Sequence, residues 1–388
     1  MRYPDLFLTK CFEGMDKMPK NFNSENRKDL FVARHQVLSI LVITPFETPS
    51  WTWLSKYFSI KKFSWKFLNG NLFGKNKLFW ALHAWKATRQ ASVNDLIISH
   101  HPYMTLWVAA ALRIRGSKKP HIAFSFNHGN RAFFVGLLLW LAKRVLSDVA
   151  LFNVLSAGER ILFNHKYKIP MTKIRFSHWA VQPVKVENQI SEEYKSFQPY
   201  ITSMGRNNRD FDTLLKATET LKINVIIVCS KRDSEKLLLR PNVKVKTDIS
   251  LQESMEILNG SLFSVVPLTD NSTGAGHMTF VHAMHLGKSQ IATDVKNTQD
   301  YFVDDVHGLR VPPKDVGAMR DAIQRLIDEP KIRTRFGVAA QNFAEQWLSE
   351  QAGARSAREV IEGWAKGERW KLEPEGWSAQ LKALGVTP

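Results

Sequence analysis

The chain has 388 residues and a formal net charge of +18, and 44% of its residues are hydrophobic. This length exceeds what one hydrophobic core usually holds, so we expect two globular domains. The two cysteines, Cys11 and Cys229, lie far apart, which argues against a disulfide framework or a cysteine metal cluster. The N-terminal segment lacks the apolar core of a secretory signal, and the apolar run at 132–142 is too short to span a bilayer. We therefore expect a cytoplasmic protein, either free or peripheral on the inner face of the cell membrane.

The positive charge is concentrated in one part of the chain. Between Pro49 and Ser147 there are fifteen Lys and Arg residues and one acidic residue, Asp95. Residues 51–85 interleave this charge with Trp and Phe. A basic surface can bind nucleic acid, an anionic membrane or an acidic substrate. Aromatic residues beside Lys favour the membrane interface, whereas each aromatic residue taken singly is typical of a core.

The first half alternates apolar strand-like runs with helical patterns. Strands are predicted at 37–46, 94–101 and 119–127. Helices are predicted around 78–90 and 104–116, between these strands. This alternation is typical of a parallel sheet that is covered on both faces.

The second half shows the same alternation. Six strands are predicted, at 199–205, 223–230, 242–248, 261–268, 288–294 and 307–313. The clearest helix is predicted over 315–328, where apolar residues fall on one face. The sequence thus predicts an α/β fold with an N-terminal domain over 1–185, a second domain over 186–350 and a helical tail over 351–388. Ligands of such folds bind at the carboxyl ends of the strands.

The segment "SMGRNNRDFDTLLKA", residues 203–217, joins a strand to a helix start. Arg206 and Arg209 follow the strand, and Asp210 and Asp212 lie near the helix N-terminus, where carboxylates are favourable. Two arginines at this place offer forked donors to a diphosphate. They can equally be solvated or paired with the two aspartates. We do not interpret the two aspartates as a metal site, because they are typical helix-start residues and no other carboxylates converge there.

The segment "STGAGHMTFVHAMHLGK", residues 272–288, also follows a strand and opens a helix. Gly274 and Gly276 allow the backbone to turn its N–H groups towards a ligand, and the helix adds the positive end of its dipole. Together with the two arginines, this loop predicts a clamp for a pyrophosphate.

These two segments, with "NVKVKTDISLQESMEILNGSLFSVVPL" and "DYFVDDVHGLRVPPKDVGAMRDAIQRLIDEP", occur in an order that resembles the nucleotide-sugar-binding half of a GT-B glycosyltransferase. The resemblance is to retaining glycosyltransferase family 4 (group 1) and covers roughly residues 200–345. It implies two Rossmann-like domains that face a cleft, with C-terminal helices packing back. It also implies that Arg206 and Arg209 hold the donor's diphosphate. The remaining donor-binding positions that it implies are Gly274, Ala275, Gly276, His277 and Met278.

The chain departs from the family pattern at two positions. Most members carry two glutamates separated by seven residues, and Gly274 and His282 stand at the matching positions. His282 is therefore a candidate for the ribose contact, although an ordinary helix residue is an equal interpretation. We interpret His285 as a helix residue with an ordinary hydrogen bond.

A third segment, "FSFNHGN" at 124–130, ends a predicted strand of the first domain. His128 resembles the strand-end histidine that many relatives place near the transferred sugar, where it can orient a hydroxyl group. Without the resemblance, a turn histidine with a structural bond is the simpler interpretation. His100 and His101 are rival candidates for the same cleft.

The sequence thus predicts a glycosyltransferase that uses a nucleotide-diphosphate sugar and a glycan or lipid-linked acceptor of cell-surface polysaccharide or lipopolysaccharide synthesis. The expected catalytic residues are His128 and Arg206. We expect retention of configuration and no metal or cofactor, since arginine and a helix dipole can stabilise the leaving diphosphate. Peripheral binding to an anionic membrane is expected, and nucleic-acid binding is not. The alternative is a non-enzymatic binding protein, either a catalytically dead GT-B domain or a basic nucleic-acid binder.

Overall fold

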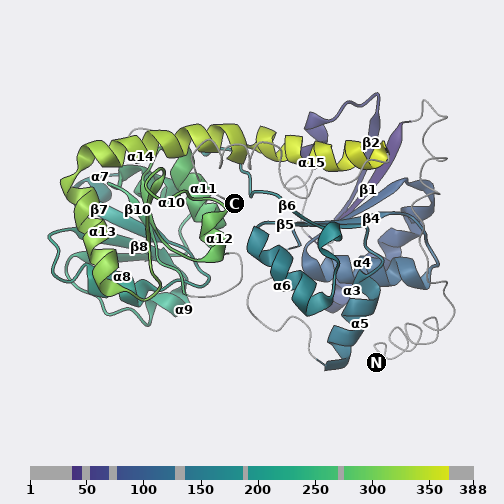
Figure 1. Ribbon diagram of the computed structural model, residues 1–388, viewed down its shortest axis with the longest axis horizontal. Coiled ribbons are helices and arrows are strands. Elements are labelled where there is room, and N and C mark those ends of the chain that lie inside the picture. The colour runs from purple at the N-terminus through teal and green to yellow at the C-terminus, as the bar shows by residue number, and fades with distance from the viewer. Residues whose placement is uncertain are drawn as a thin grey trace. The chain divides into compact units, whose positions relative to one another are not determined.

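The computed structural model describes residues 37–45, 53–69, 77–126, 136–186, 191–269 and 275–366. The chain forms two compact units, each built on a six-stranded parallel sheet (Figure 1). Unit 1 comprises residues 1–155, 159–177 and 354–388, and unit 2 comprises 156–158 and 178–353. The predicted α/β fold with two Rossmann-like domains is confirmed. In the described ranges no helix is long and apolar enough to cross a membrane.

The sheet of unit 1 has the strand order β2-β1-β3-β4-β5-β6. Its strands are β1 (Leu38–Thr44), β2 (Phe63–Asn69), β3 (Leu96–His100), β4 (His121–Phe124), β5 (Leu151–Val154) and β6 (Ile174–Phe176). The three strands predicted in this half are confirmed as β1, β3 and β4. The structure adds β2, β5 and β6. The last two are four and three residues long, which is too short to show a sequence period.

One face of this sheet is covered by a row of helices. They are α3 (Lys77–Ala87), α4 (Pro102–Ile114), α5 (Gly136–Leu146) and α6 (Ala157–Tyr167), with short 3₁₀ turns at Thr88–Val93 and Met171–Lys173. Leu41 and Ile43 of β1 pack on α3 and α4, while Phe152 of β5 packs on α5 and α6. The apolar run at 132–142, too short to span a bilayer, overlaps α5, whose residues Ala142 and Leu146 are buried.

The other face of the same sheet is covered by the C-terminal helix α15 (Glu350–Ala365) and the 3₁₀ helix η2 (Trp53–Tyr57). Ala357, Ile361 and Trp364 of α15 pack in one cluster with the strands. Arg175 of β6, which is buried, forms an ion pair of 2.7 Å with Glu359 of α15. The expectation that C-terminal helices pack back is therefore met by α15, although residues 367–388 lie outside the described ranges.

The edge strand β2 corrects one interpretation of the basic aromatic stretch 51–85. Phe63 is buried, and Trp65 and Phe67 pack against the same cluster, with their rings stacked at a centroid distance of 5.9 Å. Ser64 and Lys66 alternate with them on the exposed side. The aromatic residues of this strand therefore face the core. The charged residues between them obscure the two-residue alternation that is typical of a strand.

The sheet of unit 2 has the strand order β12-β11-β10-β7-β8-β9. Its strands are β7 (Tyr200–Met204), β8 (Asn224–Cys229), β9 (Val243–Thr247), β10 (Ser264–Val266), β11 (Gln290–Thr293) and β12 (Gly308–Val311). All six correspond to strands predicted from the sequence. Because every pairing is parallel, the carboxyl ends of all six strands lie at one edge of the sheet.

Helices cover both faces of this second sheet (Figure 1). One face carries α8 (Phe211–Ala217), α13 (Val316–Asp328) and α14 (Pro330–Phe343), and the other carries α7 (Glu192–Lys195), α10 (Leu251–Gly260) and α11 (His277–His285). Short helices α9 (Lys231–Ser234) and α12 (Lys296–Gln299) and a π-helical turn at Ala344–Leu348 complete the unit.

Several of these helices are preceded by a capping residue whose side chain accepts a hydrogen bond from a backbone N–H of the first turn. Asp210 accepts from Thr213 N at 3.2 Å, Ser250 from Glu253 N at 3.0 Å and Asp315 from Ala318 N at 2.9 Å. Each such cap contributes about 1 kcal/mol, so these residues fix where the loops at the strand ends stop.

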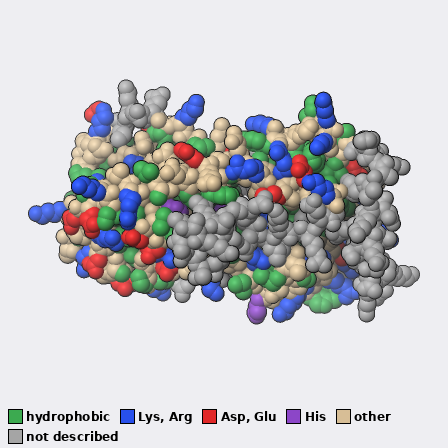
Figure 2. Space-filling view, turned by 45° about the horizontal axis from the view of Figure 1, so that its top comes forward, with side chains coloured by type: hydrophobic (Ala, Val, Ile, Leu, Met, Phe, Trp, Pro, Cys, Tyr) green, Lys and Arg blue, Asp and Glu red, His purple; other side chains and the backbone are tan. Residues whose placement is uncertain are grey.

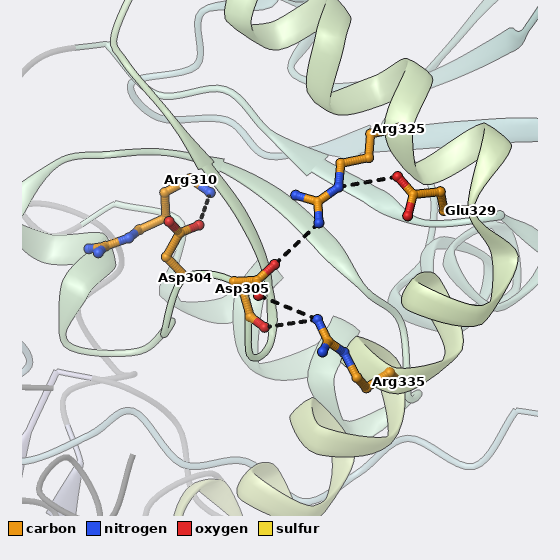
Figure 3. A network of polar contacts seen from close by, with 6 residues as sticks. All are labelled: Asp304, Asp305, Arg310, Arg325, Glu329 and Arg335. Carbon is orange, nitrogen blue, oxygen red and sulfur yellow. Dashed lines mark hydrogen bonds and ion pairs between the residues drawn. The ribbon is translucent and has the colours of Figure 1, made fainter. Parts of the chain in front are cut away.

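An exposed network of charges joins the segment before β12 to two helices. Asp305 lies between Arg325 of α13 and Arg335 of α14, at 3.5 and 3.4 Å, and Arg325 also pairs with Glu329 at 3.4 Å (Figure 3). Exposed pairs of this kind contribute little each. We interpret the network as a structural tie and not as a binding site.

Candidate functional site

The candidate site lies in unit 2, at the carboxyl ends of the neighbouring strands β7 and β10. The loop after β7 is held to the segment after β10 by two backbone hydrogen bonds. Asp210 N donates to Pro267 O at 3.0 Å, and Thr269 N donates to Asn208 O at 3.1 Å. The two motifs that the sequence analysis singled out are therefore brought together by the sheet.

Arg209 braces this loop instead of pairing with the nearby aspartates. Its guanidinium donates to Met204 O at 2.9 Å, to Asn207 O at 2.8 Å and to Thr279 Oγ1 on α11 at 3.1 Å. Burial lowers the pKa of Arg209 to about 10, so the side chain stays charged at neutral pH. The arginine thus carries a positive charge to the point where the β7 loop meets α11.

The two aspartates of the motif have other partners. Asp210 caps α8 by accepting from the backbone N–H and the hydroxyl of Thr213. Asp212 pairs with Lys216 at 2.7 Å on the exposed side of the helix. Both carboxylates are therefore helix-start residues, as expected. In the described part of the chain no group of three or more His, Cys, Asp or Glu could hold a metal ion.

Gly205 is the residue that makes room for Arg209. Its φ is +140°, and a Cβ atom built there would lie 2.2 Å from Arg209 Nη2 and 2.4 Å from Cζ. A side chain at this position would displace a guanidinium that three hydrogen bonds hold in place. The motif needs glycine here because the arginine folds back over the end of the strand.

Arg206 differs from Arg209 in its surroundings. It is exposed at the end of β7, and among the described residues it has no hydrogen bond or ion pair. Its guanidinium is therefore available to an anion at this edge of the sheet. The diphosphate contact of Arg206 stays a prediction.

The helix α11 begins next to this loop. Gly276, at the N-cap, has a φ of +87°, and a Cβ atom there would lie 2.9 Å from Phe280 Cε2. Ala275 is buried and Met278 is exposed, while Gly274 lies outside the described residues. The N–H groups of the first turn and the helix dipole at this end favour an anion. The backbone is therefore suited to the phosphate contacts predicted for this loop, which stay a prediction.

Below the start of α11 lies a stack of rings that the sequence analysis missed. The ring of His277 stacks on Tyr301 at a centroid distance of 4.4 Å, and His178 meets Tyr301 edge-on at 5.1 Å. His178 Nε2 contacts Asp300 O at 2.8 Å. Burial lowers the pKa of His277 to about 3 and that of His178 to about 4, so both are neutral at physiological pH.

No local sequence pattern signals this stack, since His178 and Tyr301 are more than a hundred residues apart. From the sequence, His277 is predicted only as a donor-binding position of the loop, and no role is predicted for its ring. In the structure its side chain is buried, and Nε2 has no hydrogen-bond partner among the described residues. The ring fixes the first turn of α11 by packing.

The two later histidines of α11 have different surroundings. His282 is buried, and its pKa is lowered by burial and by the nearby His285. Its ribose contact stays a prediction. His285 Nε2 lies 3.3 Å from Leu348 O, which agrees with its interpretation as a helix residue with an ordinary hydrogen bond.

The first-unit candidates can be placed in part. His128 lies outside the described residues. His100 is buried at the end of β3, where burial and then His101 lower its pKa well below the usual value. His101 has a φ of +80°, accepts from Tyr103 N at the start of α4, and has its ring in contact with those of Trp80 and Tyr103.

Comparison with known proteins agrees with this geometry. Residues 187–343 match the family described as glycosyl transferases group 1. The match covers the loop of Arg206 and Arg209 and the whole of α11, so this part of the chain is similar to the glycosyl transferases group 1 family. No curated protein sequence matches the chain.

Solved structures extend the likeness to both units. A glycosyltransferase from Rickettsia africae ESF-5 has a TM-score of 0.65 at 14% identity, over 85% of this chain and 99% of that one. Sucrose-phosphate synthase from Thermosynechococcus elongatus has a TM-score of 0.66 at 16% identity, over 84% and 98%. Anabaena Alr3699/HepE in complex with UDP-glucose has a TM-score of 0.64 at 14% identity, over 84% and 99%. The fold is therefore GT-B, and fold and family match together support glycosyl transfer.

Proposed function

We propose that this protein transfers a sugar from a nucleotide-diphosphate sugar to a glycan or lipid-linked acceptor. The observation that carries the proposal is the joined pair of loops in unit 2. Arg209 of the first loop contacts Thr279 in the first turn of α11, and the exposed Arg206 lies in the same loop, inside the region of the group 1 family match. The complexes of HepE with UDP, with UDP and glucose, and with UDP-glucose support the nucleotide-sugar class of donor.

The proposed chemistry is electrostatic stabilisation of the leaving diphosphate. Cleavage of the sugar–phosphate bond places negative charge on the departing phosphate oxygens. Arg206 would donate to these oxygens, and the amides of Ala275 to Met278 would add the positive end of α11. Arg209 would keep the β7 loop in place next to α11, because its guanidinium already donates to Met204 O, Asn207 O and Thr279 Oγ1. We propose that transfer proceeds with retention and uses these groups in place of a metal.

The sugar side of the reaction is assigned from the family resemblance. His128 would orient a hydroxyl of the transferred sugar, and His282 would contact the ribose. The acceptor would be a lipid-linked glycan or a lipopolysaccharide core, and the enzyme would work at the inner face of the cell membrane. A structural neighbour described as the lipopolysaccharide outer core galactosyltransferase WaaB, with a TM-score of 0.58 at 13% identity, supports this class of acceptor.

A second function is favoured by one sequence feature. Gly274 and His282 replace both glutamates of the family motif, which would suit a binding domain that has lost catalysis. Hydrolysis or transfer assays with a panel of nucleotide-sugars separate the two functions. If the wild type releases or transfers sugar and the Arg206→Ala variant does so more slowly, the result supports an active glycosyltransferase. Binding of nucleotide-sugar without any sugar release or transfer supports the dead domain.

A further inference from the structure

The turn between η2 and β2 of unit 1 presents an apolar side chain to solvent. Lys62 N donates to Ser59 O at 3.0 Å and Phe63 N donates to the same oxygen at 2.9 Å. Leu38 N, at the start of β1, donates to Lys62 O at 2.8 Å. The turn is thus fastened to the sheet, and Ile60 at its apex is 87% exposed.

Isoleucine is unusual at such a position. Turns favour Gly, Pro, Asn, Asp and Ser, because these residues suit the backbone or bond to it locally. The neighbouring apolar residues are not exposed in the same way. Phe58 and Phe63 are buried, with ring centroids 4.9 Å apart, and Arg358 of α15 lies over Phe58 at 5.5 Å. The packing of the turn therefore leaves Ile60 as its one largely exposed apolar side chain among residues 54–69, whose side chains the structure describes.

The charge around this apex has one sign. Four lysines of the turn and its flanks are exposed and have no ion pair among the described residues; they are Lys56, Lys61, Lys62 and Lys66. Residues 53–69 contain no acidic residue. Acidic side chains on neighbouring elements already have partners, since Glu359 pairs with Arg175, Glu362 pairs with Arg358, and Asp95 accepts from the backbone N–H and the hydroxyl of Ser39. In Figure 2, Asp and Glu gather mainly on the left, over unit 2.

We infer that the turn Ser59–Lys62 docks unit 1 on an anionic lipid bilayer. Ile60 would enter the boundary between headgroups and acyl chains, while Lys56, Lys61, Lys62 and Lys66 would meet anionic headgroups. This deepens the proposed use of a lipid-linked acceptor, and its biological sense rests on that proposal. It also replaces the expected insertion of Trp and Phe at this turn, because Phe58 and Phe63 are buried and Trp65 and Phe67 pack against the same cluster.

A bilayer fits this surface better than nucleic acid does. Proteins that bind single strands combine a basic groove with exposed aromatic rings on which bases stack. Here Phe58 and Phe63 are buried, and Trp65 packs on Phe58 at 5.1 Å. An aliphatic apex offers no hydrogen bond to a phosphodiester, but it gains from leaving water for the apolar part of a bilayer.

The test is co-sedimentation of the full chain with vesicles of phosphatidylcholine alone or with phosphatidylglycerol added. The wild type should bind the anionic vesicles preferentially, and high salt should weaken but not abolish that binding. Ile60→Ser should lower the partition coefficient by about tenfold, as expected for one partly inserted aliphatic side chain. Lys61→Gln with Lys62→Gln should lower it by roughly 25-fold on anionic vesicles, about fivefold per lysine.

Matched variants control for exposure and charge. Ile161→Ser changes another exposed isoleucine of unit 1, which lies on α6 and is 58% exposed. Lys231→Gln with Lys236→Gln removes the same charge from exposed positions of unit 2. Neither should change vesicle binding by more than about twofold. All variants should keep the wild-type melting temperature, since the substituted side chains are exposed.

Two results would overturn the inference. Equal binding of wild type and Ile60→Ser would show that the apex does not insert. A loss confined to the lysine variants would leave a purely electrostatic surface, suited to nucleic acid or an acidic polysaccharide. Nucleotide diphosphates should raise the melting temperature of Ile60→Ser as they do for the wild type. The docking inference and the proposed function can therefore fail separately.

Discussion

Replacement of Gly205 by alanine should cost more stability than an ordinary glycine substitution. The new Cβ atom would lie 2.2 Å from Arg209 Nη2 and 2.5 Å from Nε. The guanidinium must then leave, although its bonds to Met204 O, Asn207 O and Thr279 Oγ1 hold it. The φ of +140° adds backbone strain in an L-residue.

The magnitude follows from these two terms. The backbone strain costs about 1–2 kcal/mol. Hydrogen bonds from a charged group contribute about 1.5–3 kcal/mol each, and relaxed geometry can keep some of them. We therefore expect Gly205→Ala to lower the free energy of unfolding by about 4 kcal/mol, and Arg209→Ala to lower it by about 3 kcal/mol.

A double-mutant cycle isolates the contact. Once Arg209 is alanine, Gly205→Ala has nothing to displace, so the double variant should cost about 4–5 kcal/mol and not the sum of about 7 kcal/mol. Urea unfolding followed by circular dichroism and tryptophan fluorescence measures each corner of the cycle.

Gly116 supplies the matched control. It also has a positive φ, of +63°, and a Cβ atom there would meet nothing within 4 Å. Gly116→Ala should cost only the backbone strain, about 1–2 kcal/mol. If Gly205→Ala costs no more than Gly116→Ala, or if the two substitutions of the cycle are additive, Arg209 does not brace the loop as described.

Two further predictions concern histidines of unit 2. His282→Glu should keep or improve nucleotide binding, measured by calorimetric titration, and His282→Leu should weaken it if this position faces the ribose; equal affinities in all three proteins would make His282 a helix residue. Burial holds the pKa of His178 and His307 at about 4 and that of His277 at about 3, against 6.5 in the unfolded chain. The unfolded state therefore binds more protons below pH 6.5, and each histidine should remove about 2 kcal/mol of stability at pH 5 relative to pH 7. Urea unfolding across this range should show stability rising with pH, and His307→Leu should lose its share of the slope, whereas a flat profile would contradict the burial of these rings in the neutral form.

Much of the fold could be predicted because its signals are local. The helix α13 begins at Val316, within one residue of the prediction, since the capping residue Asp315 precedes an amphipathic run. The strands of unit 2 are apolar runs bounded by polar residues, which are typical of parallel sheets. The edge strand β2 has a weaker sequence signal, because the charges of Lys61, Lys62 and Lys66 obscure the alternation of Phe63, Trp65 and Phe67.

The site could be predicted only where one segment carries it. Arg206 and Gly276 follow strands and precede helices, and that order is visible in the sequence. The contacts of Arg209 with Thr279, and of His277 with Tyr301, depend on how distant segments meet in the folded sheet. No spacing in the sequence records them. The diphosphate contact of Arg209 stays a prediction, and its described contacts hold the loop.

The most direct test of the central claim is calorimetric titration of the full chain with UDP, GDP and ADP, in the wild type and in Arg206→Ala. Arg232→Ala serves as the control, because Arg232 is an exposed arginine of unit 2 that lies in the short helix after a different strand. We predict that the wild type binds at least one of these nucleoside diphosphates without a sugar attached, and that Arg206→Ala weakens this binding at least tenfold, as loss of a charge-assisted hydrogen bond does. Arg232→Ala should bind like the wild type. Absence of binding to any of the three, or equal affinity in the wild type and Arg206→Ala, would contradict the assignment of a diphosphate site to the joined loops of β7 and β10.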